Sequence, residues 1–452
     1  MRRVATSVAA MLLGLGLAGH AGAQSQPAAP KVVVIHAGSL LDKPGQAPRG
    51  ASTIVVRGGK IEAVKDGFAA PESVGAAGAQ VVDLRDQFVL PGLIDSHVHI
   101  FSDDDKVRAR MEGFNRDDED DMVIGIDNAR RTLEAGFTTI RDLGSDIHAV
   151  TALRDGINNG LLTGPTIVAA GSPISVTGGH GDRSNNLNRD LAEIAHQHAE
   201  NVCNGAEDCR RAVRSQIGQG ADVIKFTATG GVLSNVAGGL GAQMFEDEMK
   251  AVVETAHMFG RKVAAHAHGT DGIIGALNAG VDSIEHGTFG TAQTDALFKK
   301  TGAYFVPTML APKTALDQAR AGARSKASLE KAEIAAKTAM ENHKRAIASG
   351  VKIAFGTDTG VSAHGDNAKE FALMVSVGMS PAEAIKAATV NAADLLGRSA
   401  SIGTLEPGKD ADIIAVAKSP LGDVTQLERT TFVMHRGAVA KIGGLRAPFP
   451  PN

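Results

Sequence analysis

The feature that most constrains the fold is a regular alternation of short apolar segments with helical patterns over residues 91–398. Most of the apolar segments, which have the length of buried strands, are followed by a longer helical pattern such as Glu246–Phe259 or Leu329–Ala348. Eight strands that alternate with helices predict a (β/α)₈ barrel, the TIM barrel. The expected strands are Gly92–His99, Thr138–Asp142, Thr166–Ala170, Asp222–Phe226, Lys262–His268, Ser283–Gly287, Tyr304–Thr308 and Lys352–Asp358.

The two ends of the chain have a different texture from the middle. Short strand-like runs fill residues 31–66, where Gly58 and Gly59 indicate a hairpin, and return over residues 410–435. We therefore expect one small β-sandwich domain built from both termini, with residues 31–90 and 399–445 flanking a barrel of residues 91–398. The last barrel helix is marked by a capping box from Ser380 to Glu383 with Pro381 at its first position.

The first 23 residues have the pattern of an export signal. Arg2 and Arg3 precede a small apolar run, Val4–Gly19, and Ala21–Ala23 is an A-x-A cleavage site. The alternative is a membrane anchor, but the run is short for a membrane span. We expect residues 1–23 to be removed and the mature protein to be periplasmic or secreted, with no membrane attachment.

The cysteines and the charges further limit which classes of protein the chain can belong to. Cys203 and Cys209 are the only cysteines, and in an oxidising compartment they are expected to form a disulfide, the alternative being two unpaired thiols. The net charge is -4, and no basic stripe indicates nucleic-acid binding. The segment Ser102–Met122 carries nine acidic residues and is either a selector for basic substrates or, the preferred interpretation, a solvated helical face.

Ligand-type side chains recur where the expected strands end. In a barrel of this kind the catalytic groups lie at the carboxyl ends of the strands, and residues two apart on a strand point to the same side. Each residue alone has an ordinary structural explanation, but their joint occurrence on five strands indicates a metal site. These residues are His97, His99, Lys225, His266, His268, His286 and Asp358.

Two motifs carry a family resemblance that covers nearly all of the mature chain. Residues 89–99, which end in His97-Val-His99, resemble the opening motif of the amidohydrolase superfamily, and residues 404–412 resemble its closing motif. The segments around His180, Lys225, His266, His286 and Asp358 resemble those of the imidazolonepropionase-related peptidases, a group that includes Xaa-Pro dipeptidases and ochratoxin-hydrolysing enzymes.

The resemblance implies two divalent metal ions, usually zinc. His97, His99 and Asp358 would hold the first ion, His266 and His286 the second, and Lys225 would bridge them as a carbamate. An ammonium group beside two dications would be strongly repelled, whereas a carbamate carries a negative charge. Paired ions lower the pKa of a bound water, and Asp358 would take its proton and pass it to the leaving amine.

The remaining histidines are expected to face the substrate. His180 and His268 would donate to the carbonyl oxygen, although His268 equally fits a contact that orients His266. Arg183 is a candidate for pairing with a substrate carboxylate, with an ordinary surface arginine as the alternative.

The sequence thus predicts a hydrolase of dipeptides or N-acyl amino acids that cleaves the amide bond to a C-terminal amino acid, with ochratoxin-type amides also fitting. A ring hydrolase or deaminase of the same fold is the alternative, but such enzymes use one metal and generally lack the bridging lysine. A non-catalytic relative is a third hypothesis, and the complete ligand set argues against it. Relatives of this kind also lead us to expect a homo-oligomer, with an octamer as one form.

Overall fold

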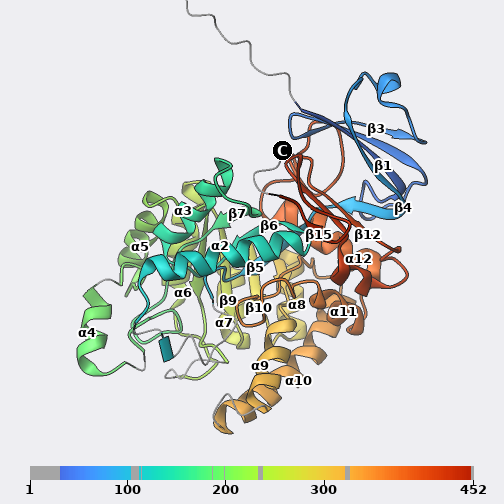
Figure 1. The fold of residues 1–452 in the computed structure, drawn as a ribbon. Helices are drawn as coiled ribbons and strands as arrows, with labels where there is room; N and C mark the ends of the chain where they lie inside the picture. Colours follow the sequence, from blue (N-terminus) through green and yellow to red (C-terminus); the bar gives the residue numbers. More distant parts are fainter. Residues whose placement is uncertain are drawn as a thin grey trace, which may run out of the picture.

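The computed structural model describes residues 31–102, 111–112, 115–185, 187–197, 199–232, 238–320 and 326–448. It has two parts, a β domain and a barrel surrounded by helices (Figure 1). The expected export signal lies outside the described residues. No helix among those described is long and apolar enough to cross a membrane.

Strands from both ends of the chain form the β domain, in which N-terminal (blue) and C-terminal (red) strands lie side by side (Figure 1). They make one eight-stranded sheet, in which β4 joins the two halves by pairing with β1 and β12. Buried residues of both halves, among them Ile54 and Phe432, share one core. The sheet order is β15 (Leu445–Arg446), β14 (Ala438–Ile442), β13 (Phe432–His435), β12 (Ile413–Val416), β4 (Gln80–Pro91), β1 (Val32–Leu40), β2 (Ser52–Arg57) and β3 (Lys60–Asp66).

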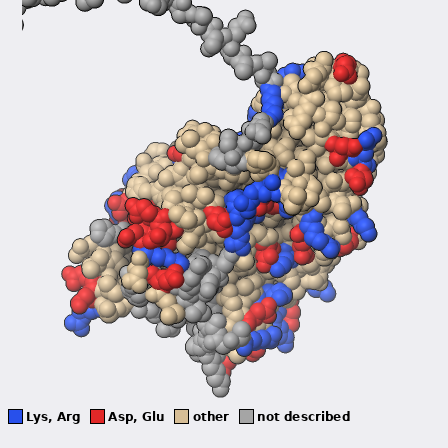
Figure 2. Space-filling view, viewed as in Figure 1, with Lys and Arg blue, Asp and Glu red and all other residues tan. Residues whose placement is uncertain are grey.

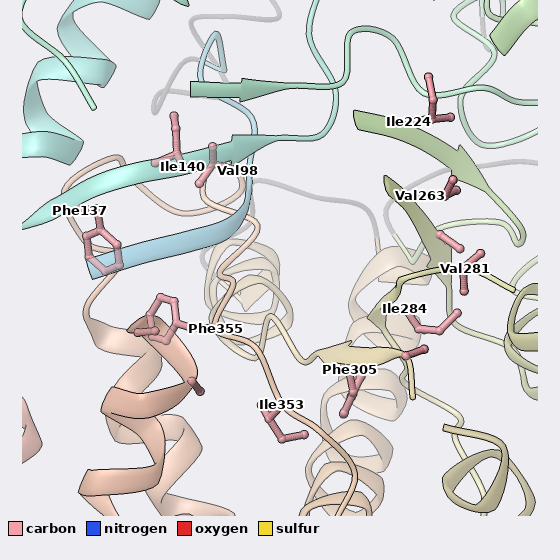
Figure 3. Packing of buried hydrophobic residues seen from close by; sticks show 14 of the residues in the cluster. Val98, Phe137, Ile140, Ile224, Val263, Val281, Ile284, Phe305, Ile353 and Phe355 are labelled. Atoms are coloured by element: carbon pink, nitrogen blue, oxygen red, sulfur yellow. The ribbon is translucent and has the colours of Figure 1, made fainter. Parts of the chain in front are cut away.

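The barrel strands are parallel and nearly all of their residues are buried, because helices cover their outer faces and side chains fill the interior. Figure 3 shows the core between the strands and the helices, with Phe137, Phe305 and Phe355 among its large side chains. The barrel strands are β5 (Leu93–Val98), β6 (Phe137–Asp142), β7 (Thr166–Ala169), β8 (Val223–Thr227), β9 (Lys262–Ala267), β10 (Ser283–His286) and β11 (Tyr304–Val306).

The eighth expected strand, Lys352–Asp358, is extended chain with isolated bridges and no regular ladder. It still closes the barrel, because Phe305 N donates to Lys352 O at 2.8 Å on one side and Ser96 N donates to Phe355 O at 2.9 Å on the other. Asp358 has a φ of 58°, a left-handed conformation that breaks a strand. The sequence pattern therefore placed the segment correctly, but its pairing is limited to isolated bridges at Ile353 and Thr359, and Phe355 N donates to Ala387 O instead of to a strand.

The helices surround the barrel, and α9 and α10 project from it as a hairpin (Figure 1). The capping box at Ser380 is present, with its Oγ accepting from Glu383 N at 3.3 Å. The helices are α2 (Asp118–Glu134), α3 (Ile147–Asn158), α4 (Arg189–Gln197), α5 (Ala206–Gly218), α6 (Glu246–Met258), α7 (Thr270–Ala279), α8 (Ala292–Thr301), α9 (Leu310–Arg320), α10 (Lys326–Ala348), α11 (Lys369–Ser376), α12 (Pro381–Lys386) and α13 (Ala392–Leu395). Short turns of other helix types occupy Pro71–Val74, Ala387–Asn391 and Val424–Arg429.

The structure bears on two of our expectations about loops, the disulfide and the acidic segment. A disulfide joins Cys203 to Cys209, as expected. Within the acidic segment, residues 103–110 and 113–114 lie outside the described part, while Asp118–Asp121 form the first turn of α2. Acidic side chains there interact favourably with the helix dipole, and Asp118, Glu119 and Asp120 are exposed. Figure 2 shows acidic side chains gathered on the face of the molecule that α2 crosses. This part of the segment is the solvated helical face that we preferred.

Candidate metal centre

Four histidines and one aspartate meet at the carboxyl end of the barrel. Their elements are β5 with the residue that follows it, β9, β10 and the segment that closes the barrel. The ring centroids of His97 and His286 are 5.0 Å apart, and those of His266 and His286 are 4.5 Å apart. Asp358 Oδ1 lies 3.1 Å from His99 Nε2. The five ligand candidates from separate parts of the sequence therefore form one cluster.

Hydrogen bonds on the outer nitrogens fix how the rings face. The Nδ1 atom of His97 lies 2.9 Å from Glu285 Oε2, and that of His99 lies 3.2 Å from the carbonyl oxygen of Gly144. A carboxylate and a carbonyl only accept, so each Nδ1 carries the hydrogen and each Nε2 keeps its lone pair.

His286 follows the same rule. Its Nδ1 lies 2.8 Å from Thr308 Oγ1, whose own hydrogen goes to the carbonyl oxygen of Pro307. The buried Nε2 atoms of His97 and His266 have no hydrogen-bond partner among the described residues. The ligand atoms form two groups that share His286, one with His97 and Asp358 and one with His266 and His268, and within each group they lie within 4.8 Å of one another. Buried lone pairs this close together are what divalent metal ions require, so the residues present fit metal binding.

The electrostatics agree with metal binding. Burial lowers the pKa of His97 to about 4 and lowers the pKa values of His266 and His286 well below the ordinary range. Burial alone would raise the pKa of Asp358, but His97 and His99 beside it hold that pKa below its usual range. At neutral pH the cluster therefore presents neutral imidazoles at His97, His266 and His286 and an ionised carboxylate, the forms that bind metals. Burial lowers the pKa of His99 as well, but the carboxylate of Asp358 beside it outweighs that effect and raises the pKa.

Lys225 is the third residue of β8 and lies on the wall of the same cavity. Its side chain is enclosed by the barrel, with a residue exposure of 4%. Burial lowers the pKa of its amine to about 8. About a tenth of an amine with this pKa is neutral at pH 7, far more than for an ordinary lysine. The neutral amine is the form that reacts with CO₂ to give a carbamate and a proton.

A buried ion pair behind His97 is a feature that our sequence reasoning missed. Arg141 on β6 donates from Nη2 to Glu285 Oε1 at 2.9 Å, and the other oxygen of Glu285 accepts from His97. Burial opposes ionisation of Glu285, but Arg141 holds its pKa at about 2. A signal for this pair was present, because both charged residues lie within expected strands of the barrel, where a buried charge needs a partner.

The expected substrate-facing residues differ in where they lie. His180 lines the cavity with its ring centroid 4.3 Å from that of His266, and its buried Nδ1 has no partner among the described residues. His268 lies within the cluster, since its ligand atom is within 4.8 Å of those of His266 and His286. Arg183 is exposed, donates to Ser172 Oγ at 3.3 Å and is absent from the described residues that line the cavity.

The cavity over the cluster has a volume of about 370 Å³. One wall is made of the candidate metal ligands, and another is made of small apolar residues of α9 and α10, such as Ala315 and Ala339. His343 of α10 also lines it and donates from Nε2 to the carbonyl oxygen of His286 at 2.8 Å. Sequence reasoning missed this histidine, because a single histidine within a helix carries no pattern.

Comparison with known proteins places this site in a class. The family model described as the amidohydrolase family matches residues 88–442, and the chain therefore belongs to the amidohydrolase family. The family and the relatives described below show that the protein is a hydrolase that acts on amide bonds.

Within that family the chain stands in a dipeptidase-like group. It is 33% identical to ochratoxinase of Aspergillus niger over 421 residues, which are 90% of this chain and 85% of the relative. A crystal structure of a Xaa-Pro dipeptidase with methionine bound in its active site matches with a TM-score of 0.85 and 38% identity, covering 91% of this chain and 100% of the other. A prolidase complexed with N-methylphosphonate-L-proline matches with a TM-score of 0.81 and 28% identity, covering 91% and 100%.

Proposed function

We propose that the chain is a binuclear metal-dependent amidohydrolase that cleaves the amide bond to a C-terminal amino acid in dipeptides or N-acyl amino acids. The observation that carries the proposal is the convergence of all six expected ligands on one cavity. That cavity is at the small end of the range for small-molecule sites, which suits a dipeptide-sized substrate. The relatives include a Xaa-Pro dipeptidase and ochratoxinase, whose names describe substrates of this kind.

His97, His99 and Asp358 would hold one ion, and His266 and His286 the other, with carbamylated Lys225 between them. Imidazole nitrogens and carboxylate oxygens are typical zinc ligands, and zinc is the metal we propose. Bound divalent ions would polarise the scissile carbonyl and supply an activated water at neutral pH.

The protein's own groups would then move protons and hold the substrate. Asp358 Oδ1 faces His97 and His99, and the lowered pKa of this carboxyl keeps it ionised at neutral pH, the form that could take a proton and pass it to the leaving amine. His180 and His268 line the same cavity and would donate to the carbonyl oxygen as negative charge develops there. The short distance from His268 to the ligand group also allows it to orient His266 and His286.

A substrate carboxylate needs a positively charged or hydrogen-bonding partner near the cavity. Arg183 remains our candidate, since it bonds to Ser172, the residue next to Pro173 of the cavity wall. From its exposed position its guanidinium would have to turn towards the cavity to make a two-pronged contact.

The test compares one dipeptide with its C-terminal amide and measures the metal content. We expect about two ions per chain, and a fall in kcat/KM of roughly 10- to 1000-fold when the carboxylate is removed. Equal rates on both compounds would refute recognition of the carboxylate and favour a broader amidase. One ion per chain together with ring-opening activity would favour the ring hydrolase or deaminase instead.

We further propose that the protein is exported. We also propose that it assembles as a homo-oligomer, of which an octamer is one form. Mass spectrometry of the protein from its host should find Gln24 as the first residue, and retention of residues 1–23 would refute export by this signal. Light scattering that gives the mass of a single chain would refute the oligomer.

A further inference from the structure

Of the two histidines expected to face the substrate, His268 directly follows β9, whereas His180 lies in a longer loop away from the barrel strands. It belongs to a loop between β7 and α4, and its own backbone N donates to Gln243 Oε1 at 2.9 Å. Among the described residues, its ring Nδ1 has no hydrogen-bond partner and its ring makes no ion pair. The place of the ring over His266 therefore depends on how the loop backbone is held.

Asn201 supports the backbone of the loop that carries His180. Its side chain is buried, with 6% of the residue exposed, and its amide nitrogen donates to two carbonyl oxygens of the loop. These belong to Pro173, at 2.8 Å, and to Gly181, the residue after His180, at 3.1 Å. One amide group thus ties the start of the loop to its tip.

The backbone on either side of Asn201 is paired with the same loop. Ser175 N donates to the carbonyl of Asn201 at 3.1 Å, and Cys203 N donates to that of Ser175 at 2.8 Å. Ser175 Oγ in turn accepts from Gly181 N at 3.1 Å and from Thr227 of β8 at 2.9 Å. This places the tip of the loop in register with the strand that carries Lys225.

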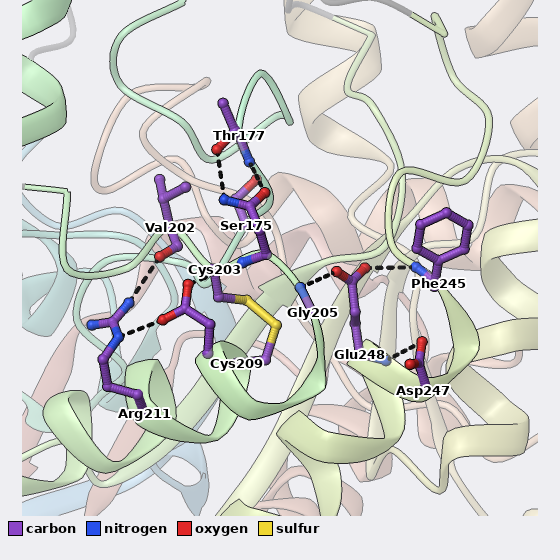
Figure 4. Close-up of a disulfide and its surroundings, with 12 residues drawn as sticks. Ser175, Thr177, Val202, Cys203, Gly205, Cys209, Arg211, Phe245, Asp247 and Glu248 are labelled. Atoms are coloured by element: carbon purple, nitrogen blue, oxygen red, sulfur yellow. Dashed lines mark hydrogen bonds and ion pairs between the residues drawn. A yellow bond between two sulfur atoms is a disulfide. The ribbon is translucent and has the colours of Figure 1, made fainter.

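The disulfide anchors the segment that contains Asn201. It joins Cys203 to Cys209 in the first turns of α5, and both cysteines are fully buried. Between them, Gly205 N donates to Glu248 Oε1 of α6 at 2.7 Å (Figure 4). The segment that supports the loop is therefore fixed to two barrel helices.

We infer that Asn201 is a positioning residue for His180, and that the Cys203–Cys209 disulfide keeps Asn201 in place. This inference rests on the proposed function of His180 at the reacting carbonyl. It assigns the disulfide to the placement of one active-site group as well as to the fold. An error of about 1 Å in the position of such a group costs on the order of 100-fold in rate.

The first test is Asn201→Asp, which replaces the amide donor by an oxygen that faces two carbonyl oxygens. We expect kcat on an N-acyl amino acid to fall by roughly 10- to 100-fold with the metal content unchanged. Hydrogen exchange should become faster in peptides that cover residues 173–181 but not in those that cover residues 262–267. The matched control is Asn158→Asp, an exposed asparagine beside Arg436, which should leave all three measurements unchanged.

A double variant separates positioning from general damage. In a His180→Ala background, Asn201→Asp should cause little further loss of kcat, because the group that it positions is gone. An equal loss in both backgrounds, or unchanged loop exchange in Asn201→Asp, would overturn the inference. If the wild-type protein hydrolyses none of these amides, the proposed function fails, while the exchange measurement still decides whether Asn201 holds the loop.

The disulfide has its own test in a variant with Cys203→Ala and Cys209→Ala. We expect faster exchange over residues 173–181 and a fall in kcat in the same direction as for Asn201→Asp. Wild-type exchange and wild-type kcat in the folded double variant would overturn the part of the inference that concerns the disulfide.

Discussion

Replacing Glu285 by glutamine should reveal two functions of the buried pair formed by Glu285 and Arg141. The pair stabilises the fold, and it supports metal binding through His97. Glu285 and Arg141 are 0% and 1% exposed, and their nearest charged atoms lie 2.9 Å apart. At that distance two unit charges attract by about 6 kcal/mol at an effective dielectric constant of 20. Removal of one partner leaves the other charge buried without compensation, which costs about 3 to 5 kcal/mol.

The substitution should also weaken metal binding. Glu285 accepts the hydrogen of His97 Nδ1 and thereby keeps the Nε2 lone pair directed at the cluster. A glutamine can present its NH₂ group there and favour the opposite tautomer. Loss of such a supporting contact typically costs 10- to 100-fold in metal affinity.

Two measurements on Glu285→Gln test this reasoning, denaturant unfolding of the metal-free protein and metal titration of the folded protein. The matched control is Asp295→Asn, in which a buried carboxylate loses its charge opposite Arg345, whose side chain is 35% exposed. Solvent can compensate that arginine, so we expect a cost of about 1 kcal/mol or less and normal metal binding. If Glu285→Gln were no less stable than the control and bound metal normally, the reasoning would be refuted.

Three further predictions concern the lysine, a buried glutamate and the apolar wall. Lys225→Ala should abolish activity, with partial recovery on addition of short carboxylic acids; full activity without them would exclude the bridging carbamate. Burial raises the pKa of Glu370 from 4.5 to about 8, so its stabilising contribution is complete below pH 4.5 and is lost as the pH rises through 8. The free energy of unfolding should therefore fall between pH 5 and 8, and this group contributes at most roughly 1.4 kcal/mol per pH unit to that fall. Glu370→Gln should make the fall shallower. Urea titrations that give the same dependence on pH for the variant and the wild type would contradict this. Ala339→Leu should lower the ratio of kcat/KM for N-naphthoyl substrates to kcat/KM for N-acetyl substrates by about 10-fold, because overpacking costs about 1–3 kcal/mol. The control Ala348→Leu, at an exposed position of α10, should leave this ratio unchanged. Equal ratios in the two variants would count against this wall as a substrate contact.

The sequence by itself determined the barrel and the positions of the candidate ligands along its strands. Short buried strands and amphipathic helices have different periods, so their alternation is visible without coordinates. The carboxyl ends of parallel barrel strands meet at one rim, which is why His97, His266 and His286 could be expected together from their places in the expected strands. The capping box at Ser380 was equally local, since it depends on residues three apart.

Only the tertiary structure decided which groups support the ligands. Arg141 and Glu285 are 144 positions apart, and a hydrogen bond between them follows from the curvature of the barrel, which no local pattern records. The same holds for Asn201, whose amide reaches carbonyl oxygens 20 and 28 residues away. The irregular backbone at Asp358 likewise depends on contacts with Asp95 and His97 on the opposite side of the closure. Local periodicity fixes an element and its faces, whereas a contact between side chains of distant elements exists only once packing has set their separation and orientation.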